Sequence, residues 1–451
     1  MPGFLTIGLL ALPVLAVAAG DAGLAAAVDE HHAHVRALYV ELHQHPELHT
    51  QEQWTGARIA QELREAGFDV QAGIGGHGAV GVLKNGDGPV LLLRTIMDAL
   101  PIAEKTGLPF ASTARAIATD GSEVPVAHVC GHDAIMAGAI GAARILSTRR
   151  AWWQGTLIVL AQPADESLLG ARAMLADGLK DRMPEPDFII GYHLLPDFTS
   201  AQVAWVKGYG LAGSETAEII VRGVPGHASF PSAARDPVPL AAQIVLALQT
   251  FIAREVPPLD AVTLNIGSIH GGQEVSAIPA EVKLGLSMSF YSEAVREMLR
   301  ARIPEIAESL ARAAGMPDER LPSVTFLDNG IGATYNDPAL VERARQGFAW
   351  AVGADNVVEG AQLLGTDETV ALAQAYSEPV PMMFFYYGAS EPAAFAAAQA
   401  GGKPLPSLHA PEFAPDVDAT LKTGTKALVG AVVGVLPPTS GSGRELPAAT
   451  P

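Results

Sequence analysis

Three short motifs in this sequence bring together side chains that bind metal ions. Cys130 and His132 lie in AHVCGHD, two residues apart, directly before a predicted helix. Asp165 and Glu166 follow the apolar run TLIVLAQ, and His193 ends the apolar run DFIIGYH. Thiolate, imidazole and carboxylate are the ligands that zinc and similar divalent ions take in proteins. The motifs therefore predict a metal site, provided that the fold brings them together.

The elements around these motifs alternate between helices and short buried strands. Helices are expected over 31–43, 55–67, 134–146 and 171–178, and strands over 80–83, 89–95, 156–162 and 187–193. This alternation predicts an α/β fold with a mostly parallel sheet flanked by helices. Ligands of open α/β sheets bind at the carboxyl ends of the strands. We therefore expect the motifs, and MDALP at 97–101, to meet at one edge of the sheet.

Each candidate residue also has a structural interpretation of its own. A lone cysteine before a helix is more often packed in a core than bound to a metal. His193 at a strand end is equally compatible with a hydrogen-bonded structural histidine, and adjacent acids such as Asp165 and Glu166 usually lie in a solvated loop. The whole set favours a site, in which one acid could act as general base and the other as ligand.

The remaining histidines carry a weaker signal. A dense group near the N-terminus is expected on the solvated face of helices, namely His31, His32, His34, His43, His45 and His49. His227 lies in GVPGHASFP, a turn where a histidine is either surface decoration or a group that faces a substrate. The sequence has no GxSxG, Walker or HExxH motif.

The pattern of elements changes near Ser214. Strands over 215–223, 261–269, 281–290 and 323–328, with helices over 236–255 and 291–315, give the order β-α-β-β-α-β of a ferredoxin-like unit. The α/β pattern then resumes with helices over 338–352 and 419–436. We therefore predict a small domain, 213–327, inserted into a larger one formed by 28–212 and 328–438.

Composition excludes several classes of protein. The 451 residues are 49% hydrophobic and 17% charged, which is typical of a chain with a core. The net charge of −19 argues against a nucleic-acid partner, and a single cysteine excludes an intramolecular disulfide. Residues 1–27 are interpreted as a signal peptide or N-terminal extension, cleavable after Ala16-Val17-Ala18, so that a periplasmic or secreted location is expected, with the cytoplasm as the alternative. No membrane span is predicted, and 439–451 is expected to be a disordered tail.

Several motifs, in order, resemble the M20 metallopeptidases, in particular the amidohydrolase branch that includes hippurate hydrolases and auxin-conjugate hydrolases. The resemblance extends from about residue 28 to residue 436. The motifs that carry it are HQHPELHTQEQWT, MDALPI, HVCGHD, QPADE, GYHLLP, GHASFPSAARDP, IGSIHGG with its following IP, and LHAPEF.

The resemblance implies metal-dependent hydrolysis of the amide bond of N-acyl amino acids or related small amides and peptides. It implies two divalent metal ions (zinc, manganese, cobalt or nickel) in the larger, catalytic domain, with five ligands: Cys130, His132, Glu166, His193 and His409. It assigns the general base to Asp165 and assigns to His227 the binding of a substrate carboxylate or an oxyanion. The small domain would be a lid that also forms a homodimer.

Several positions depart from the family pattern. The base is an aspartate where the family has a glutamate, which shortens its reach by about 1 Å. Other polar positions of the pattern are changed at Ile96, Ile135, Ser276, Met288 and Asp367. Two alternatives therefore stay open. The first is a catalytically impaired relative that acts as a binding or dimeric protein. The second is a carrier of apolar ligands, with Ile96, Ile135 and Met288 lining its pocket.

Overall fold

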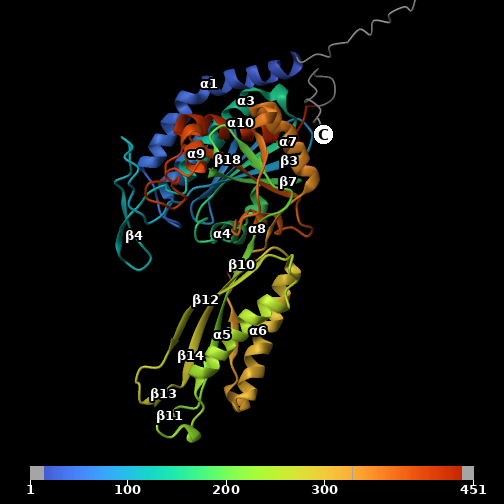
Figure 1. Cartoon of the computed structure of the whole chain (residues 1–451). Coiled ribbons are helices and arrows are strands. Elements are labelled where there is room, and N and C mark those ends of the chain that lie inside the picture. Colours follow the sequence, from blue (N-terminus) through green and yellow to red (C-terminus); the bar gives the residue numbers. More distant parts are fainter. Residues whose placement is uncertain (1–14, 328, 439–451) are drawn as a thin grey trace, which may run out of the picture. The chain divides into compact units, whose positions relative to one another are not determined.

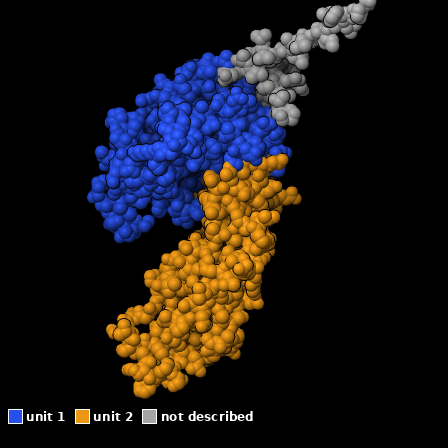
Figure 2. Space-filling model, viewed as in Figure 1, with its two compact units in different colours: residues 1–205, 338–360, 384–451 blue, residues 206–337, 361–383 orange. Residues whose placement is uncertain are grey.

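The computed structural model describes residues 15–327 and 329–438. The chain divides into two compact units (Figure 2). The first comprises 1–205, 338–360 and 384–451, and the second comprises 206–337 and 361–383. Residues 1–14 of the predicted N-terminal extension and the predicted tail at 439–451 lie outside the described residues.

The first unit is built on an eight-stranded sheet in the order β1-β2-β6-β3-β7-β18-β8-β17. Its strands β3, β7 and β18 are labelled in Figure 1. Its central strands β6, β3 and β7 are parallel, whereas β1, β2 and the β8–β18 pair are antiparallel. The strands are β1 (Asp69–Ile74), β2 (Gly78–Asn85), β3 (Val90–Ile96), β6 (Gly155–Gln162), β7 (Phe188–Thr199), β8 (Val203–Trp205), β17 (Val357–Glu359) and β18 (Met382–Ser390). Every residue of β6 is buried, as a strand covered on both faces requires. The predicted α/β fold class is confirmed.

Helices cover this sheet. They are α1 (Leu15–Gln44), α2 (Gln53–Glu65), α3 (His132–Thr148), α4 (Gly170–Ala176), α7 (Pro338–Val352), α9 (Pro392–Gln399) and α10 (Val417–Val435). Helix α8 (Thr369–Ala373) belongs to the second unit. Helix α10 packs against α7, α3 and α1. It approaches α7 closely because both contact positions are glycines: a Cβ at Gly347 would lie 1.9 Å from the carbonyl oxygen of Gly430.

Helix α1 is longer than the predicted segment 31–43. It is continuous from Leu15, through the predicted cleavage site, to Gln44. Leu24, Ala27 and Val28 are buried, so the helix joins the core some residues before position 31. Short pairs of strands complete the chain: β4 (Arg115–Ile117) with β5 (Glu123–Pro125), β9 (Gly208–Leu211) with β16 (Thr334–Asn336), and β11 (Gly226–His227) with β13 (Ala277–Ile278).

The second unit contains a four-stranded sheet in the order β12-β14-β10-β15. Its main elements follow the chain as β10 (Gly213–Arg222), α5 (Pro237–Arg254), β12 (Val262–Gly271), β14 (Glu281–Phe290), α6 (Glu293–Ala313) and β15 (Ser323–Phe326). All pairings in this sheet are antiparallel. This is the β-α-β-β-α-β order of the split unit. The side chains of Asp236 and Ser292 cap the two helices by accepting backbone N–H groups.

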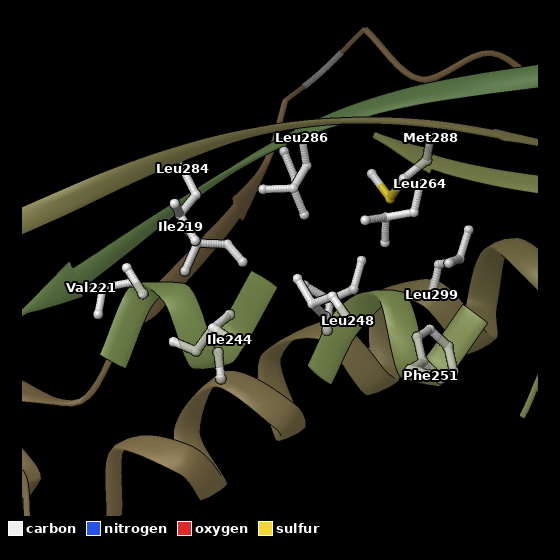
Figure 3. Close-up of a cluster of buried hydrophobic side chains, with 14 of the residues drawn as sticks. Ile219, Val221, Ile244, Leu248, Phe251, Leu264, Leu284, Leu286, Met288 and Leu299 are labelled. Atoms are coloured by element: carbon white, nitrogen blue, oxygen red, sulfur yellow. The ribbon is translucent and has the colours of Figure 1, made fainter. Parts of the chain in front are cut away.

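One face of this sheet packs against α5 and α6 (Figure 3). Alternate residues of β10 and β14 are buried, which is the period of a sheet with one face in a core. Met288 is 1% exposed and lies in this core with Leu264 and Leu299. It therefore does not line a ligand pocket with Ile96 and Ile135, and the carrier interpretation loses one of its three residues.

Helix α5 is, within 15–327 and 329–438, the one helix whose length and apolar composition would suffice to cross a membrane. The same test is passed by core helices of water-soluble proteins. Leu240, Ile244, Leu248 and Phe251 of α5 are buried against the sheet. We therefore interpret α5 as a packing helix of the second unit.

Candidate metal centre

A sharp turn before α3 places Cys130 and His132. Gly131 between them has φ of +81°, a left-handed conformation that glycine adopts without strain. A Cβ at this position would lie 2.8 Å from the side chain of Leu194. The turn therefore requires glycine, and it positions Cys130 and His132 on the carboxyl-end side of the sheet.

The structure brings the five predicted ligands together in two groups that share Cys130. The first group is Cys130, His132 and His193, and the second is Cys130, Glu166 and His409; within each group the ligand atoms lie within 4.8 Å of one another. His193 Nε2 is 3.6 Å and His409 Nε2 is 3.1 Å from Cys130 Sγ. His409 Nε2 also lies 3.3 Å from Glu166 Oε1. Two groups around one thiol are the arrangement expected of a two-metal site.

Neighbouring backbone groups orient two of the histidines. His132 Nδ1 donates to the carbonyl oxygen of Asp98 at 2.8 Å, and His193 Nδ1 donates to that of Leu194 at 2.7 Å. Each bond leaves Nε2 as the atom with a lone pair, directed at the cluster. Asp98 Oδ2 also accepts the backbone N–H of Glu166 at 2.9 Å. Such outer contacts are what fix ligating histidines and carboxylates in metal sites.

The electrostatics of the cluster favour anionic ligands. Burial disfavours the Cys130 thiolate, but His132 and His193 outweigh this effect and lower the pKa of Cys130 to about 6. Burial likewise opposes ionisation of Glu166, yet His409 and His132 lower its pKa to about 2. A thiolate and a carboxylate are therefore available at neutral pH, and they are the forms that bind metal.

The cluster also fits a metal ion by what it leaves unsatisfied. Over 15–327 and 329–438, His132 Nε2 is buried without a hydrogen-bond partner, and the buried Glu166 Oε1 lies near His409 and His132 but forms no hydrogen bond with either. Unpaired buried polar atoms are costly in a folded protein and require an explanation. One cysteine, three histidines and one glutamate, converging with free lone pairs, provide one: they suit zinc or a similar divalent ion.

Asp165 lies beside the cluster, but its carboxylate is engaged. Arg94 Nη2 donates to Asp165 Oδ1, and Arg94 Nε donates to Gln162 Oε1 at 2.7 Å. Arg94 is 1% exposed. The residue that the resemblance makes the general base thus also neutralises a buried guanidinium.

A buried carboxylate fixes the backbone next to Asp165. Glu52 is fully buried, and its Oε1 accepts the backbone N–H of Ala164 at 2.6 Å. Ala164 has φ of +53°, an uncommon conformation for alanine. In the part of the chain that the structure describes, Oε2 of Glu52 has no hydrogen-bond partner. Burial raises the pKa of Glu52 to about 7, partly opposed by its bond to Ala164.

Glu52→Gln is expected to gain stability relative to the parent as the pH rises. The pKa of Glu52 in the folded protein is above its unfolded value of about 4.5. Below pH 4.5 the carboxyl is protonated in both states and its burial costs little, whereas between pH 4.5 and 7 it ionises more readily in the unfolded state, which lowers the stability of the fold. The gain should grow between about pH 4.5 and 7, reach at most about 3 kcal/mol, and level off above. Denaturant unfolding across this range measures it, with Glu185→Gln on the exposed loop before β7 as control. A gain that does not depend on pH would contradict this assignment.

His43 was expected on a solvated face, and this prediction is wrong. Its side chain is buried, with Nδ1 2.6 Å from Asp133 Oδ2 and Nε2 3.1 Å from Glu104. Burial disfavours the imidazolium, but the bonds to Asp133 and Glu104 outweigh it and raise the pKa of His43 to about 10. The charged histidine joins α1 to the start of α3 and to the loop after β3. The helical pattern of α1 alone places His43 at the surface, but residues packed over α1 cover it.

The other predicted positions lie as follows. His227 belongs to the second unit, where it is exposed in β11 and its Nδ1 accepts the backbone N–H of Ser229 at 3.1 Å. Ile96 ends β3 and Ile135 lies in the first turn of α3, and both are buried. Ser276 is exposed before β13, and Asp367 is buried. The role assigned to His227 stays a prediction.

Comparisons with known proteins agree with this arrangement. Residues 92–425 match the model of Peptidase family M20/M25/M40. The chain is 34% identical over 274 residues to a hippurate hydrolase of Campylobacter jejuni, covering 60% of this chain and 68% of that protein. It is 31% identical over 362 residues to an N-acetylcysteine deacetylase of Bacillus subtilis, covering 77% and 86%. A crystal structure of a dinuclear metal-binding peptidase of the M20 family from Bacillus subtilis has a TM-score of 0.73 at 24% identity, over 91% of this chain and 99% of that one.

The chain therefore belongs to peptidase family M20/M25/M40. By this membership it is an amidohydrolase, and the resemblance read from the motifs is confirmed.

Proposed function

We propose that this protein hydrolyses the amide bond of N-acyl amino acids or related small amides with two divalent metal ions. The observation that carries the proposal is the pair of ligand groups that share Cys130, with His132 and His193 on one side and Glu166 and His409 on the other. The alternative interpretation of Cys130, a cysteine packed in a core, does not account for the three histidines and the glutamate around it.

The residues of the chain divide the work as follows. Bound ions would lower the pKa of a coordinated water and polarise the amide carbonyl. Asp165 would accept the proton of the attacking water and return it to the leaving amine. Asp98 holds His132 and the backbone of Glu166, which keeps two ligands in place. His227 would stabilise the oxyanion or bind the substrate carboxylate.

The substrate class follows from the relatives and from the cluster. Relatives are named for hydrolysis of hippurate and deacetylation of N-acetylcysteine, which are both N-acylated amino acids. The protein carries a net charge of −19, so an anionic substrate would be attracted only locally, by bound metal and by His227. Ile96 and Ile135 in place of polar residues favour a bulkier or less polar acyl or amine part.

We also propose that the protein is a homodimer that forms through its second unit. Strand β12 is at one end of the four-stranded sheet, and α5 exposes Val238 and Leu246 on its outer side. An open strand edge beside exposed apolar residues is the kind of surface that a second copy covers. Sedimentation should give a dimer, and Leu246→Glu should give a monomer. A monomeric parent protein would overturn the proposal.

For the N-terminal segment, we propose export with cleavage after Ala18. Such cleavage would leave Leu24, the first buried residue that the structure describes, within the mature chain. N-terminal sequencing of protein from a periplasmic fraction tests this. A mature chain that begins at residue 2 or 1 would contradict it.

Hydrolysis itself is tested with a small panel of substrates. Hippurate, N-acetylcysteine and an indole-acetyl amino acid should be cleaved by protein loaded with zinc, manganese, cobalt or nickel. Cys130→Ser protein prepared in parallel should cleave none of them. Metal-loaded parent protein that hydrolyses no member of a wide panel of acyl amino acids would contradict the proposal.

A second candidate function is favoured by one observation. The pairing of Asp165 with Arg94 could leave the site without an effective base, and the protein would then serve as a binding or dimeric relative. Asp165→Glu discriminates between the two candidates, as argued in the Discussion.

A further inference from the structure

We propose that Glu52 is a positioning residue for the adjacent acids Asp165 and Glu166. It acts by accepting a hydrogen bond from the backbone of Ala164, which begins the short turn from which both acidic side chains extend. The proposal rests on the proposed hydrolase function and on the geometry of the turn over 163–170, which follows β6.

The first step of the argument is the cost of burying Glu52. Its side chain is fully buried, and its Oε1 accepts the backbone N–H of Ala164 at 2.6 Å. Its Oε2 has, within 15–327 and 329–438, no hydrogen-bond partner. A buried carboxyl group with an unsatisfied oxygen is costly, and an apolar residue would fill the same space without this penalty. Stability therefore does not account for a glutamate here, and the bond to Ala164 points to a role in positioning.

The second step is the conformation of Ala164. Its φ of +53° is left-handed, a region that residues with a Cβ seldom adopt. Its carbonyl oxygen accepts the hydroxyl of Ser167 at 3.1 Å and the backbone N–H of Gly170 at 3.3 Å. A Cβ at Gly170 would lie 1.6 Å from the carbonyl oxygen of Pro163, so the turn closes tightly on itself. Backbone of this kind persists only where surrounding contacts hold it, and Glu52 supplies one of these contacts.

The third step is the place of the two acids in this turn. Asp98 Oδ2 accepts the backbone N–H of Glu166 at 2.9 Å. The carboxyl groups of Glu52 and Asp98 therefore hold the chain on both sides of Asp165. From this backbone, Glu166 Oε1 comes within 3.3 Å of His409 Nε2 in one of the two ligand groups. A shift of the turn would displace a ligand and the predicted base together, and a displacement of about 1 Å can cost about 10²-fold in rate.

The experiment compares two variants of Glu52. Glu52→Gln keeps the length and an acceptor oxygen without the charge, whereas Glu52→Asp keeps the charge on a side chain that is shorter by a methylene group. Glu52→Gln should keep kcat within about 3-fold of the parent, and Glu52→Asp should lower it about 10²-fold with little change in KM. Glu52→Met fills the space without an acceptor and should behave as Glu52→Asp, so it replaces that variant if the shorter side chain prevents folding. Equal losses in Glu52→Gln and Glu52→Asp, or full activity of the folded variant without an acceptor in reach, would overturn the proposal.

A second measurement does not depend on activity. Titration with zinc against a chromophoric chelator should show one ion bound about 10-fold or more weakly in Glu52→Asp, because Glu166 belongs to one ligand group only. Glu52→Gln should bind both ions as the parent does. Weakening of both ions alike, or of neither, in folded Glu52→Asp would overturn the proposal.

A matched control separates positioning from a general loss of stability. Glu62 is a buried carboxylate of α2 that accepts from Arg144, and Glu62→Gln should lower the melting temperature without changing either affinity. If the zinc affinities change as expected but the parent hydrolyses no acyl amino acid, the hydrolase proposal fails and the positioning of Glu166 by Glu52 stands. Hydrolysis by the parent with an equal kcat in all folded variants of Glu52 overturns the role of Glu52 alone.

Discussion

Cys130→Ser is expected to remove both metal ions from the protein, whereas His409→Asn is expected to remove one. Cys130 is common to both ligand groups, and His409 belongs only to the group with Glu166. A serine hydroxyl is a poorer metal ligand than the thiolate it replaces. Burial opposes formation of this thiolate, but His132 and His193 outweigh that effect and lower the pKa of Cys130 to about 6, so the thiolate is available at neutral pH. Metal affinity should fall by at least about 10²-fold in Cys130→Ser, and hydrolysis with it.

Elemental mass spectrometry of dialysed protein measures this difference. His32→Asn is the matched control, since His32 lies on α1 beside Asp418 and outside both ligand groups. Circular dichroism of each variant shows whether it is folded. A folded Cys130→Ser protein that keeps two ions would contradict the shared-ligand arrangement.

Asp165→Glu is expected to raise kcat by up to about 10²-fold. The added methylene group extends the carboxylate by about 1 Å, and a misplacement of this size in a reacting group can change the rate by that factor. It would also allow the carboxylate to reach beyond Arg94. Asp165→Asn has the opposite prediction: a fall of about 10²-fold or more, because an amide cannot act as a general base.

Steady-state kinetics on N-acyl amino acids test both variants, with metal content measured on the same samples. Asp181→Glu, at an exposed position of the same unit, controls for the added methylene group. If Asp165→Glu and the parent are both inactive while two ions are bound, the protein is the impaired relative. A parent enzyme that Asp165→Asn does not slow would exclude Asp165 as the base.

Much of the fold could be predicted because buried strands are recognisable in the sequence as runs of apolar residues. The runs that become β3, β6 and β7 stand out, and the helix–strand order of the second unit could be read from the sequence directly. The hairpin of β4 and β5 was not predicted, since its strands are short and half exposed. The sequence does not indicate whether the apolar stretch that forms β18 is a strand or a helix, because a fully buried strand has no alternation to distinguish it from a helix.

The candidate site shows the same division between local and long-range information. Cys130, His132, Glu166 and His193 could be proposed because each follows an element that ends at the same edge of the sheet. His409 was assigned through the resemblance alone. It reaches the cluster from a loop, with φ of +67° and a backbone N–H that donates to Val129.

The partners of the outer residues could not be predicted. Arg94 and Asp165 are 71 positions apart, and Glu52 and Ala164 are 112 apart. The periodicity of apolar residues in a sequence predicts local helices and strands, but it does not predict contacts between such distant positions. His43 was placed at the surface for the same reason, since only the fold brings Asp133 to it. A buried arginine in the strand that leads into a candidate site is the one signal that could have prompted a search for its acid.

The measurement that tests the central claim most directly is the metal content of the parent protein, purified without chelators and dialysed against one divalent metal. Two ligand groups around Cys130 predict two equivalents per chain by elemental mass spectrometry. Retention of no divalent metal, or of one equivalent in folded protein, would contradict the two-metal centre on which the proposed hydrolysis depends.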